Sequence, residues 1–304
     1  MSIDRRQKNP LIFAVPGSKT YIGDYYSNTR GSFINISITG GSCLLQCRHC
    51  RGELLRGMIH AGDSLRLVSV AERYLAAADL QGILISGGFD REGKLGFSRV
   101  LEGIGTIKSR HPHLTVYIHT GFLDEKEAGA LGQTGVDGVL VNLVKSRKAI
   151  QEVYNLKGRT YSDYLDTIRY LKKEGIRVSP HIIIGLENGR LSHEYSMVED
   201  AIGLEVDSIV FAVLKKASRS IQFPSSSVPG DDIIRLVRHA RSLGRGTFLS
   251  YGCARPPGRS AHMLETGLIK EGIDSIAFPS DSTVRFAVEN KIAHTFVEKC
   301  CANL

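Results

Sequence analysis

The sequence predicts an α/β fold, a (β/α)8 TIM-type barrel, and three observations support this prediction. Strand-like and helix-like segments alternate eight times between residues 33 and 290. The length of 304 residues suits one large core and a single barrel domain. Three cysteines lie on a loop directly after the first predicted strand. Because barrels of this type carry their sites on the loops after the strands, the cysteine loop is expected on the site face.

The first unit begins with residues 33–39, an alternating and β-branched segment that Gly40 and Gly41 end. Its helix is predicted over 63–80. In the third unit, Asp124 is the expected helix cap. The remaining strand and helix pairs are 82–86 with 97–109, 114–120 with 124–131, 139–144 with 161–173, 178–184 with 192–204, 209–214 with 231–243, 247–251 with 262–270, and 273–278 with 282–290.

Two segments flank the predicted barrel of residues 33–290. Residues 1–32 contain several Pro, Gly and Tyr residues, so they are expected to form an irregular lead-in that packs across the barrel. Residues 291–304 form a C-terminal tail that bears Cys300 and Cys301. Extended, this tail spans roughly 40 Å, which is enough to return from the last helix to the site face.

Composition indicates an ordinary soluble globular protein. Hydrophobic residues make up 42% and charged residues 23% of the chain. No apolar run is long enough to span a bilayer, and the short run 11–15 falls short of a secretory signal, so we expect a cytoplasmic protein without membrane contact. The net charge is +8, but no basic run with interleaved aromatics predicts a nucleic-acid partner.

The six cysteines fall into two groups of three. Cys43, Cys47 and Cys50 are spaced so that three thiolates could hold three irons of a 4Fe-4S cluster and leave the fourth iron open. A zinc site in which His49 completes the ligands is the alternative.

The second group is Cys253, Cys300 and Cys301. Clustered thiols in a reducing compartment are more often metal ligands than disulfides. For Cys253 the alternative is a buried small apolar residue.

The Cys-x3-Cys-x2-Cys run resembles the signature of the radical S-adenosylmethionine (SAM) superfamily. In that family the amino and carboxylate groups of SAM chelate the open iron. Ser86, Gly87 and Gly88 stand where the family has a Gly-Gly-Glu-type turn that binds the SAM amino group. Phe89 and Asp90 follow here, so the resemblance leaves backbone carbonyls or Asp90 as acceptors. His49 occupies the position at which the family stacks adenine.

Residues 142–146 and 159–186 resemble biotin synthase, a member of this superfamily. The resemblance implies that Asn142 and Arg159 contact SAM. Val144 replaces the aspartate that holds the ribose. Where biotin synthase has cysteines that hold its auxiliary cluster, this chain has Tyr117 and Ser179. An auxiliary cluster therefore cannot be built in the same place here.

Residues 14–21, the run 252–258 and the Cys300-Cys301 pair resemble a biotin-synthase-like subgroup that includes the second subunit of the two-protein archaeal-type lipoyl synthase. The resemblance implies a second Fe-S cluster on Cys253, Cys300 and Cys301, with Arg255 as a candidate fourth ligand. Residues 215–227 lack the Pro-Thr-Pro-Gly-Thr-like turn of these proteins, so the substrate can differ.

The activity implied by this resemblance is sulfur insertion into an octanoyl chain on a lipoyl-domain or glycine-cleavage H-type protein. The implied partners are a sister radical SAM subunit and ferredoxin or flavodoxin as electron donor. Two alternatives stay open: a radical SAM enzyme that acts on another small molecule, and a non-catalytic Fe-S or zinc-binding module.

Overall fold

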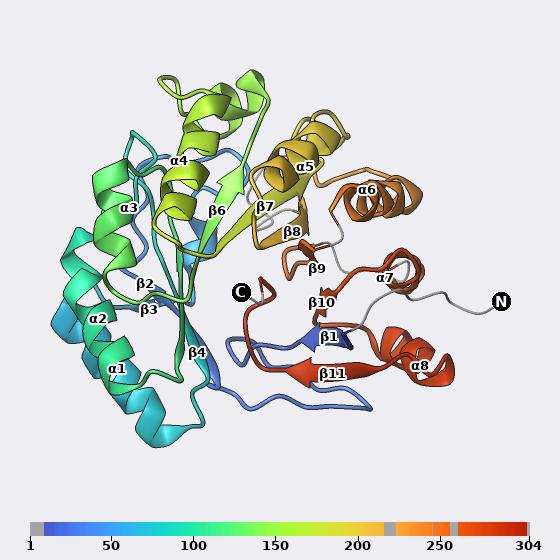
Figure 1. Ribbon diagram of the computed structural model, residues 1–304, viewed down its shortest axis with the longest axis horizontal. Helices are drawn as coiled ribbons and strands as arrows, with labels where there is room; N and C mark the ends of the chain where they lie inside the picture. The colour runs from blue at the N-terminus through green and yellow to red at the C-terminus, as the bar shows by residue number, and fades with distance from the viewer. Residues whose placement is uncertain (1–8, 216–222, 245, 256–260, 303–304) are drawn as a thin grey trace.

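The computed structural model describes residues 9–215, 223–244, 246–255 and 261–302. Its centre is one curled sheet of eleven strands, all paired in parallel, with helices on the outer face (Figure 1). The strands are β1 Leu11–Ala14, β2 Phe33–Ser37, β3 Ile59–His60, β4 Gly82–Ser86, β5 Thr115–His119, β6 Gly138–Leu143, β7 Val178–Ile184, β8 Ser208–Val213, β9 Phe248–Tyr251, β10 Ser275–Ala277 and β11 His294–Val297.

The helices cover the sheet in chain order and confirm the alternation predicted from the sequence. The α-helices are α1 Ser64–Ala77, α2 Leu101–Arg110, α3 Glu125–Gly132, α4 Tyr161–Lys173, α5 Glu194–Gly203, α6 Gly230–Leu243, α7 Ala261–Lys270 and α8 Asp281–Glu289. Short turns η1 Glu53–Leu55, η2 Phe97–Val100 and the π-helical η3 Ala149–Val153 complete the described elements. Asp124 caps α3 as predicted, in a capping box with Glu127.

The fold belongs to the parallel TIM-type class, but its sheet is open. The strand order is β11-β1-β10-β9-β8-β7-β6-β5-β4-β2-β3, and within the described ranges no pairing joins β3 to β11. Both flanking segments take part in this sheet: the lead-in supplies β1, which lies between β10 and β11, and the tail supplies β11. The apolar side chains of β1 explain its place, because Leu11, Phe13 and Ala14 are fully buried.

Two groups of buried side chains stabilise this architecture. The larger lies between the sheet and its helices. The smaller includes Tyr117, Leu140 and Val210 from three strands, together with Cys300, Cys301 and Ala302 of the tail. Figure 1 shows the chain turning after β11 toward the concave side of the sheet, where the C-terminus is marked. The tail therefore fills part of the space that the curled sheet encloses.

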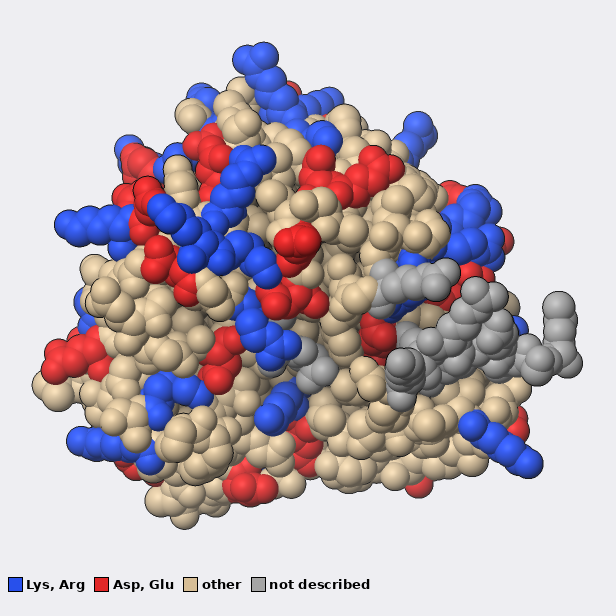
Figure 2. All heavy atoms as spheres, viewed as in Figure 1, with Lys and Arg blue, Asp and Glu red and all other residues tan. Residues whose placement is uncertain are grey.

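The surface carries both signs of charge. Figure 2 shows Lys and Arg interspersed with Asp and Glu over the face in view. None of the helices in the described ranges has the length and apolar character needed to cross a bilayer.

Candidate functional site: two cysteine groups at the carboxyl edge of the sheet

The first cysteine loop follows β2, at the carboxyl edge of the parallel sheet. Backbone bonds fix its shape: the amides of Cys50 and Arg51 both donate to the Cys47 carbonyl, at 3.1 and 2.8 Å. Asn155 donates from its side chain to the Leu45 carbonyl at 2.7 Å and to the Gln46 carbonyl at 3.1 Å. None of these bonds uses a cysteine sulfur, so the loop is held independently of any metal.

Gly88, after β4, lies directly against this loop. A Cβ at residue 88 would meet the Ser42 carbonyl oxygen at 1.9 Å and the Cys43 Cα at 2.5 Å. The amide of Gly88 donates to the Thr39 hydroxyl at 2.6 Å, and the Leu44 amide donates to the Phe89 carbonyl at 2.8 Å. The absence of a side chain at residue 88 is therefore what allows the two loops to touch.

We expect Gly88→Ala to displace the Ser42–Cys43 backbone and to reduce cluster incorporation by about tenfold or more, because the contacting atoms are backbone and cannot swing away. Gly41→Ala is the matched control, since a Cβ there meets nothing within 4 Å. Iron content and the visible absorbance after anaerobic reconstitution measure the effect. Equal iron in the two variants would contradict the prediction.

The thiol of Cys47 donates to the Tyr154 carbonyl at 3.8 Å. Interaction between the neighbouring thiols of Cys47 and Cys50 lowers the pKa of Cys50 below its usual range, with a further lowering from His49, and raises the pKa of Cys47, as does burial. Across the described residues, no three histidine, cysteine or acidic side chains converge on one metal position. The donor set and the cradle at Gly88 fit a thiolate-bound cluster, and His49 packs against Tyr154, at 5.0 Å between centroids.

The other predicted SAM contacts surround this loop. His49 is half-buried between Tyr154 and Phe223, and its buried Nδ1 has no hydrogen-bond partner among the residues that the structure describes. Ser86 is buried at the end of β4. The Asp90 side chain is hydrogen-bonded within its own turn, where its Oδ1 accepts from the amides of Glu92 and Lys94 at 3.0 and 2.7 Å. Of the predicted amine acceptors, the backbone carbonyls of the Ser-Gly-Gly turn thus fit better than Asp90.

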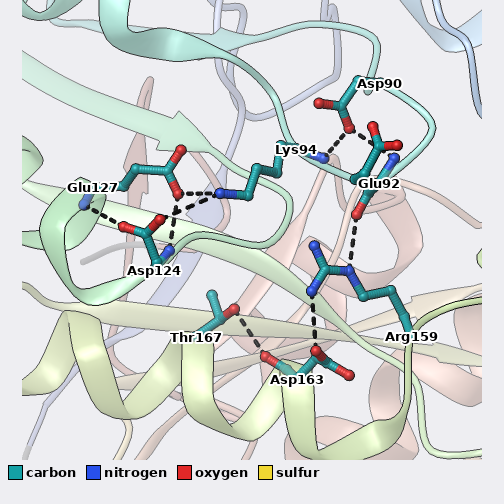
Figure 3. A network of polar contacts seen from close by, with 8 residues as sticks. All are labelled: Asp90, Glu92, Lys94, Asp124, Glu127, Arg159, Asp163 and Thr167. Atoms are coloured by element: carbon teal, nitrogen blue, oxygen red, sulfur yellow. Dashed lines mark hydrogen bonds and ion pairs between the residues drawn. The ribbon is translucent and has the colours of Figure 1, made fainter.

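Arg159 lies between the 90–94 turn and α4, as Figure 3 shows. Its Nε donates to the Glu92 carbonyl at 3.0 Å, and its Nη1 donates to Asp163 at 3.0 Å. The guanidinium also covers the ring of Phe122, 4.6 Å from the centroid. These contacts hold the guanidinium in place beside the small cavity, of about 30 Å³, that Phe122 and Asn142 help to line.

Asn142, near the end of β6, lies beside His119 of β5, and its interaction with His119 partly offsets the lowering of the His119 pKa by burial. The rings of His119 and His181 are 5.6 Å apart, and the Nδ1 of His181 lies 3.3 Å from the Ser179 carbonyl. Both histidines were missed by the sequence analysis. Strand alternation could have found them, since His119 follows Tyr117 by two residues and so shares its concave face.

The histidine pair gives the fold a defined pH dependence. Burial lowers the pKa of His119 to about 4, and burial together with the neighbouring His119 lowers the pKa of His181 to about 3. Above about pH 6.5 both are neutral whether the chain is folded or unfolded. Below it the unfolded chain binds protons that the folded chain does not, which costs about 1.4 kcal/mol per pH unit per histidine.

We therefore expect the free energy of unfolding to fall between about pH 6.5 and 4, and to fall less steeply in a His119→Gln/His181→Gln variant. Urea unfolding at several pH values measures both slopes, and carboxylate titration is common to the two proteins. Parallel pH profiles for the two proteins would contradict this prediction.

The second cysteine group gathers around the tail. Cys253 follows β9 at the carboxyl edge, and interaction with the neighbouring thiol of Cys301 raises the pKa of Cys253 well above its usual value. Interaction with Cys253 lowers the pKa of Cys301, whereas interaction with Cys300 and burial raise it, with a net rise to about 12. Cys300 and Cys301 are buried, whereas Cys253 is exposed. The structure thus brings the Cys253 thiol close to the thiols of Cys300 and Cys301, which lie nearly fifty residues later in the sequence.

Glu298 anchors the tail just before these cysteines. This buried carboxylate accepts from the Tyr26 hydroxyl at 2.8 Å and from the Thr29 amide at 3.0 Å. The ring of Tyr26 stacks on Phe296, with centroids 4.5 Å apart. The lead-in therefore fixes the direction in which the tail enters the concave side.

Arg255 lies two residues after Cys253, but its Nη2 is already engaged. It donates to Glu265 at 2.7 Å and to the Phe278 carbonyl at 2.9 Å. Its Nη1 makes only a 3.5 Å contact, with the Gly252 carbonyl. A role as cluster ligand would therefore fall to Nη1.

A parallel sheet with a three-cysteine loop after strand β2 is typical of one class of radical enzymes. The comparison of the sequence with protein families points to the same class. Residues 37–191 match the family model described as the Radical SAM superfamily, so the chain belongs to this superfamily. The family implies a 4Fe-4S cluster and SAM as cofactors.

Within the superfamily the chain is similar to biotin synthases. It is 24% identical to the biotin synthase of Prochlorococcus marinus (strain NATL1A) over 250 residues, covering 80% of this chain and 70% of the relative. It is 29% identical to that of Sorangium cellulosum over 67% of this chain and 58% of the relative. The match to the biotin synthase of Cutibacterium acnes spans 49% of that protein.

Solved structures share the fold. The [FeFe]-hydrogenase maturase HydG superposes with a TM-score of 0.60 at 15% identity, over 96% of this chain and 65% of HydG. Methylornithine synthase superposes with a TM-score of 0.57 at 13% identity, over 81% of this chain and 71% of that one. At these identities the likeness concerns the fold alone.

Proposed function

We propose that this chain is a radical SAM sulfur-insertion enzyme, the second subunit of a two-protein lipoyl synthase. Its substrate is an octanoyl chain carried by a lipoyl-domain or glycine-cleavage H-type protein, and it works in the cytoplasm with a sister radical SAM subunit and a ferredoxin or flavodoxin. The observation that carries this proposal is the gathering of Cys253, which follows β9, with Cys300 and Cys301 of the buried tail. Similarity to biotin synthases supports sulfur insertion.

Each part of the site then has a role. When bound, the SAM cluster supplies the electron that cleaves SAM to a 5'-deoxyadenosyl radical. Cys43, Cys47 and Cys50 hold that cluster, and Gly88 lets the loop close against the turn after β4. Asn142 and Arg159 orient SAM. The second cysteine group holds a second Fe-S cluster, and the tail fills the concave side so that water is excluded from it.

Asn142→Ala and Arg159→Ala should each weaken SAM binding by about 1 to 3 kcal/mol, the usual loss when a buried polar group is left without its partner. Anaerobic equilibrium dialysis measures the affinity. Arg169→Ala is a suitable control, because Arg169 is largely exposed and pairs only with Asp166 on the outer face of α4. Unchanged affinity for SAM in both site variants would show that Asn142 and Arg159 do not bind SAM.

The experiment that tests the proposed function uses an octanoylated carrier protein as substrate. Reduced, reconstituted enzyme is incubated with SAM and the carrier, with and without the sister subunit. The mass of the carrier is then measured by mass spectrometry. A mass gain that corresponds to inserted sulfur is expected. SAM cleavage without any change in the carrier would refute the lipoyl assignment.

A radical SAM enzyme for another small molecule is the second candidate. The observation that favours it is the pair His119 and His181 on the concave side, where the buried Nε2 of His119 has no hydrogen-bond partner within the described part of the chain. An octanoyl chain offers no donor to these imidazoles, whereas a substrate with an N–H or O–H group near the reacting carbon would.

A further inference from the structure

A short segment after the π-helical turn η3, residues 153–155, contacts the first cysteine loop at each of its three positions. The Val153 carbonyl accepts from the Arg48 amide at 2.8 Å, and the Tyr154 carbonyl accepts from the Cys47 thiol at 3.8 Å. The third residue of the segment contacts the loop through its side chain. Single π-helical turns are rare and are frequent at functional sites, which directs attention to this segment.

The Asn155 side chain serves two consecutive carbonyls of the loop. Its Nδ2 donates to the Leu45 carbonyl at 2.7 Å and to the Gln46 carbonyl at 3.1 Å. The described peptide bonds are all trans, and the C=O and N–H groups of a trans peptide point in opposite directions. The amides of Gln46 and Cys47 therefore point away from Asn155. Within the described chain, neither of these two amides donates to a backbone carbonyl.

The backbone of Gln46 has an uncommon conformation. Its φ of +46° lies in the left-handed region, which a residue with a Cβ adopts only where its surroundings hold it there. The bond from Asn155 to the Gln46 carbonyl is one such restraint. Successive amides around a left-handed residue can form a concave nest that binds anions, and such nests occur at many Fe-S sites.

We propose that Asn155 is a positioning residue for the SAM cluster: its side chain turns the amides of Gln46 and Cys47 toward the cluster that the three cysteines hold. A reduced cluster carries one more negative charge than an oxidised one, so amide donors stabilise the reduced form more. Asn155 thereby favours reduction of the cluster. The proposal rests on membership of the radical SAM superfamily and is independent of the lipoyl assignment.

Asn155→Gly is the test variant, because glycine keeps the left-handed φ of +58° at this position and removes both donors without adding a charge. Asn188→Gly is the matched control, since Asn188 is also exposed and left-handed, with φ of +51°. Both changes are made in a full-length background with Ala in place of Cys253, Cys300 and Cys301. Only the first cysteine group can then bind iron.

A redox titration followed by electron paramagnetic resonance measures the effect. At a fixed potential, the ratio of reduced to oxidised cluster should fall by about tenfold in Asn155→Gly, which is about 59 mV for a one-electron couple. Asn188→Gly should match the background protein, and both variants should bind about four irons per chain. Equal ratios in the two variants at equal iron content would overturn the proposal.

A second measurement decides the case in which Asn155→Gly binds little iron. The iron-free wild-type, Asn155→Gly and Asn188→Gly chains, with all six cysteines, are treated with iodoacetamide, and each cysteine is quantified by peptide mass spectrometry. Alkylation of the buried Cys47 should be about threefold faster in Asn155→Gly alone, while the buried Cys300 reacts at the wild-type rate. An unchanged rate at Cys47, or an equal rise at Cys300, would refute a positioning role, because the loop would then be unaffected or the whole chain loosened. Neither measurement uses the octanoylated carrier.

Discussion

Replacing Cys43, Cys47 and Cys50 together by Ala should abolish formation of 5'-deoxyadenosine, because the variant has lost every thiolate that could hold the SAM cluster. The barrel should stay folded, since the bonds that shape the loop run between backbone groups and Asn155. Anaerobic incubation with dithionite and SAM, followed by chromatography, measures the product, and circular dichroism checks the fold.

Cys253→Ala is the matched control, because it removes a thiol from the other group and should leave SAM cleavage in place. This comparison also separates an enzyme from a non-catalytic metal-binding module, which would cleave no SAM in either form. Cleavage at the wild-type rate by the triple variant would show that the central assignment is wrong.

The same triple variant should retain about four irons per chain, because Cys253, Cys300 and Cys301 are left to hold a second cube. The interactions of Cys301 with Cys253 and with Cys300 that shift the pKa values of these thiols indicate that the three thiols lie close together. Iron and acid-labile sulfide should be determined after reconstitution, together with the electron paramagnetic resonance spectrum of the reduced protein.

A variant that also carries Cys301→Ala is expected to lose most of this residual iron, whereas one with Ser242→Ala, an exposed position on α6, should keep it. An iron content near zero in the triple variant itself would leave the second group as simple buried thiols.

Local patterns predicted most of the sheet and the first cysteine loop. Residues 33–37 form a strand because alternating β-branched side chains bury one face, and Asp124 caps α3 because its carboxylate reaches the Glu127 amide. The resemblance assigned Gly88 to a turn that binds SAM, and the structure shows that Gly88 also lies against the cysteine loop. These features depend on residues near one another in the sequence or on one strand end.

The structural features that the sequence did not predict depend on contacts between residues far apart in the chain. The four residues of β1 are too few to predict a strand, and they form one because β10 and β11 flank them. The sheet stays open for the same reason: β1 and β11 occupy the side where β2 would have closed a barrel.

The pairing of β1 also has a consequence for how the chain acquires its structure. Ile12 lies opposite Ser275 on one side and Thr295 on the other, so this strand has no sheet partner until more than 260 further residues have been made. Contacts of such sequence separation form late and slow folding. We expect β2 to β9 to collapse first, leaving the mouth near Cys253 accessible, and the Tyr26–Glu298 contact to lock the tail in a final, slower step. The tail segment with Cys300 and Cys301 would then be among the last parts of the chain to reach its native position.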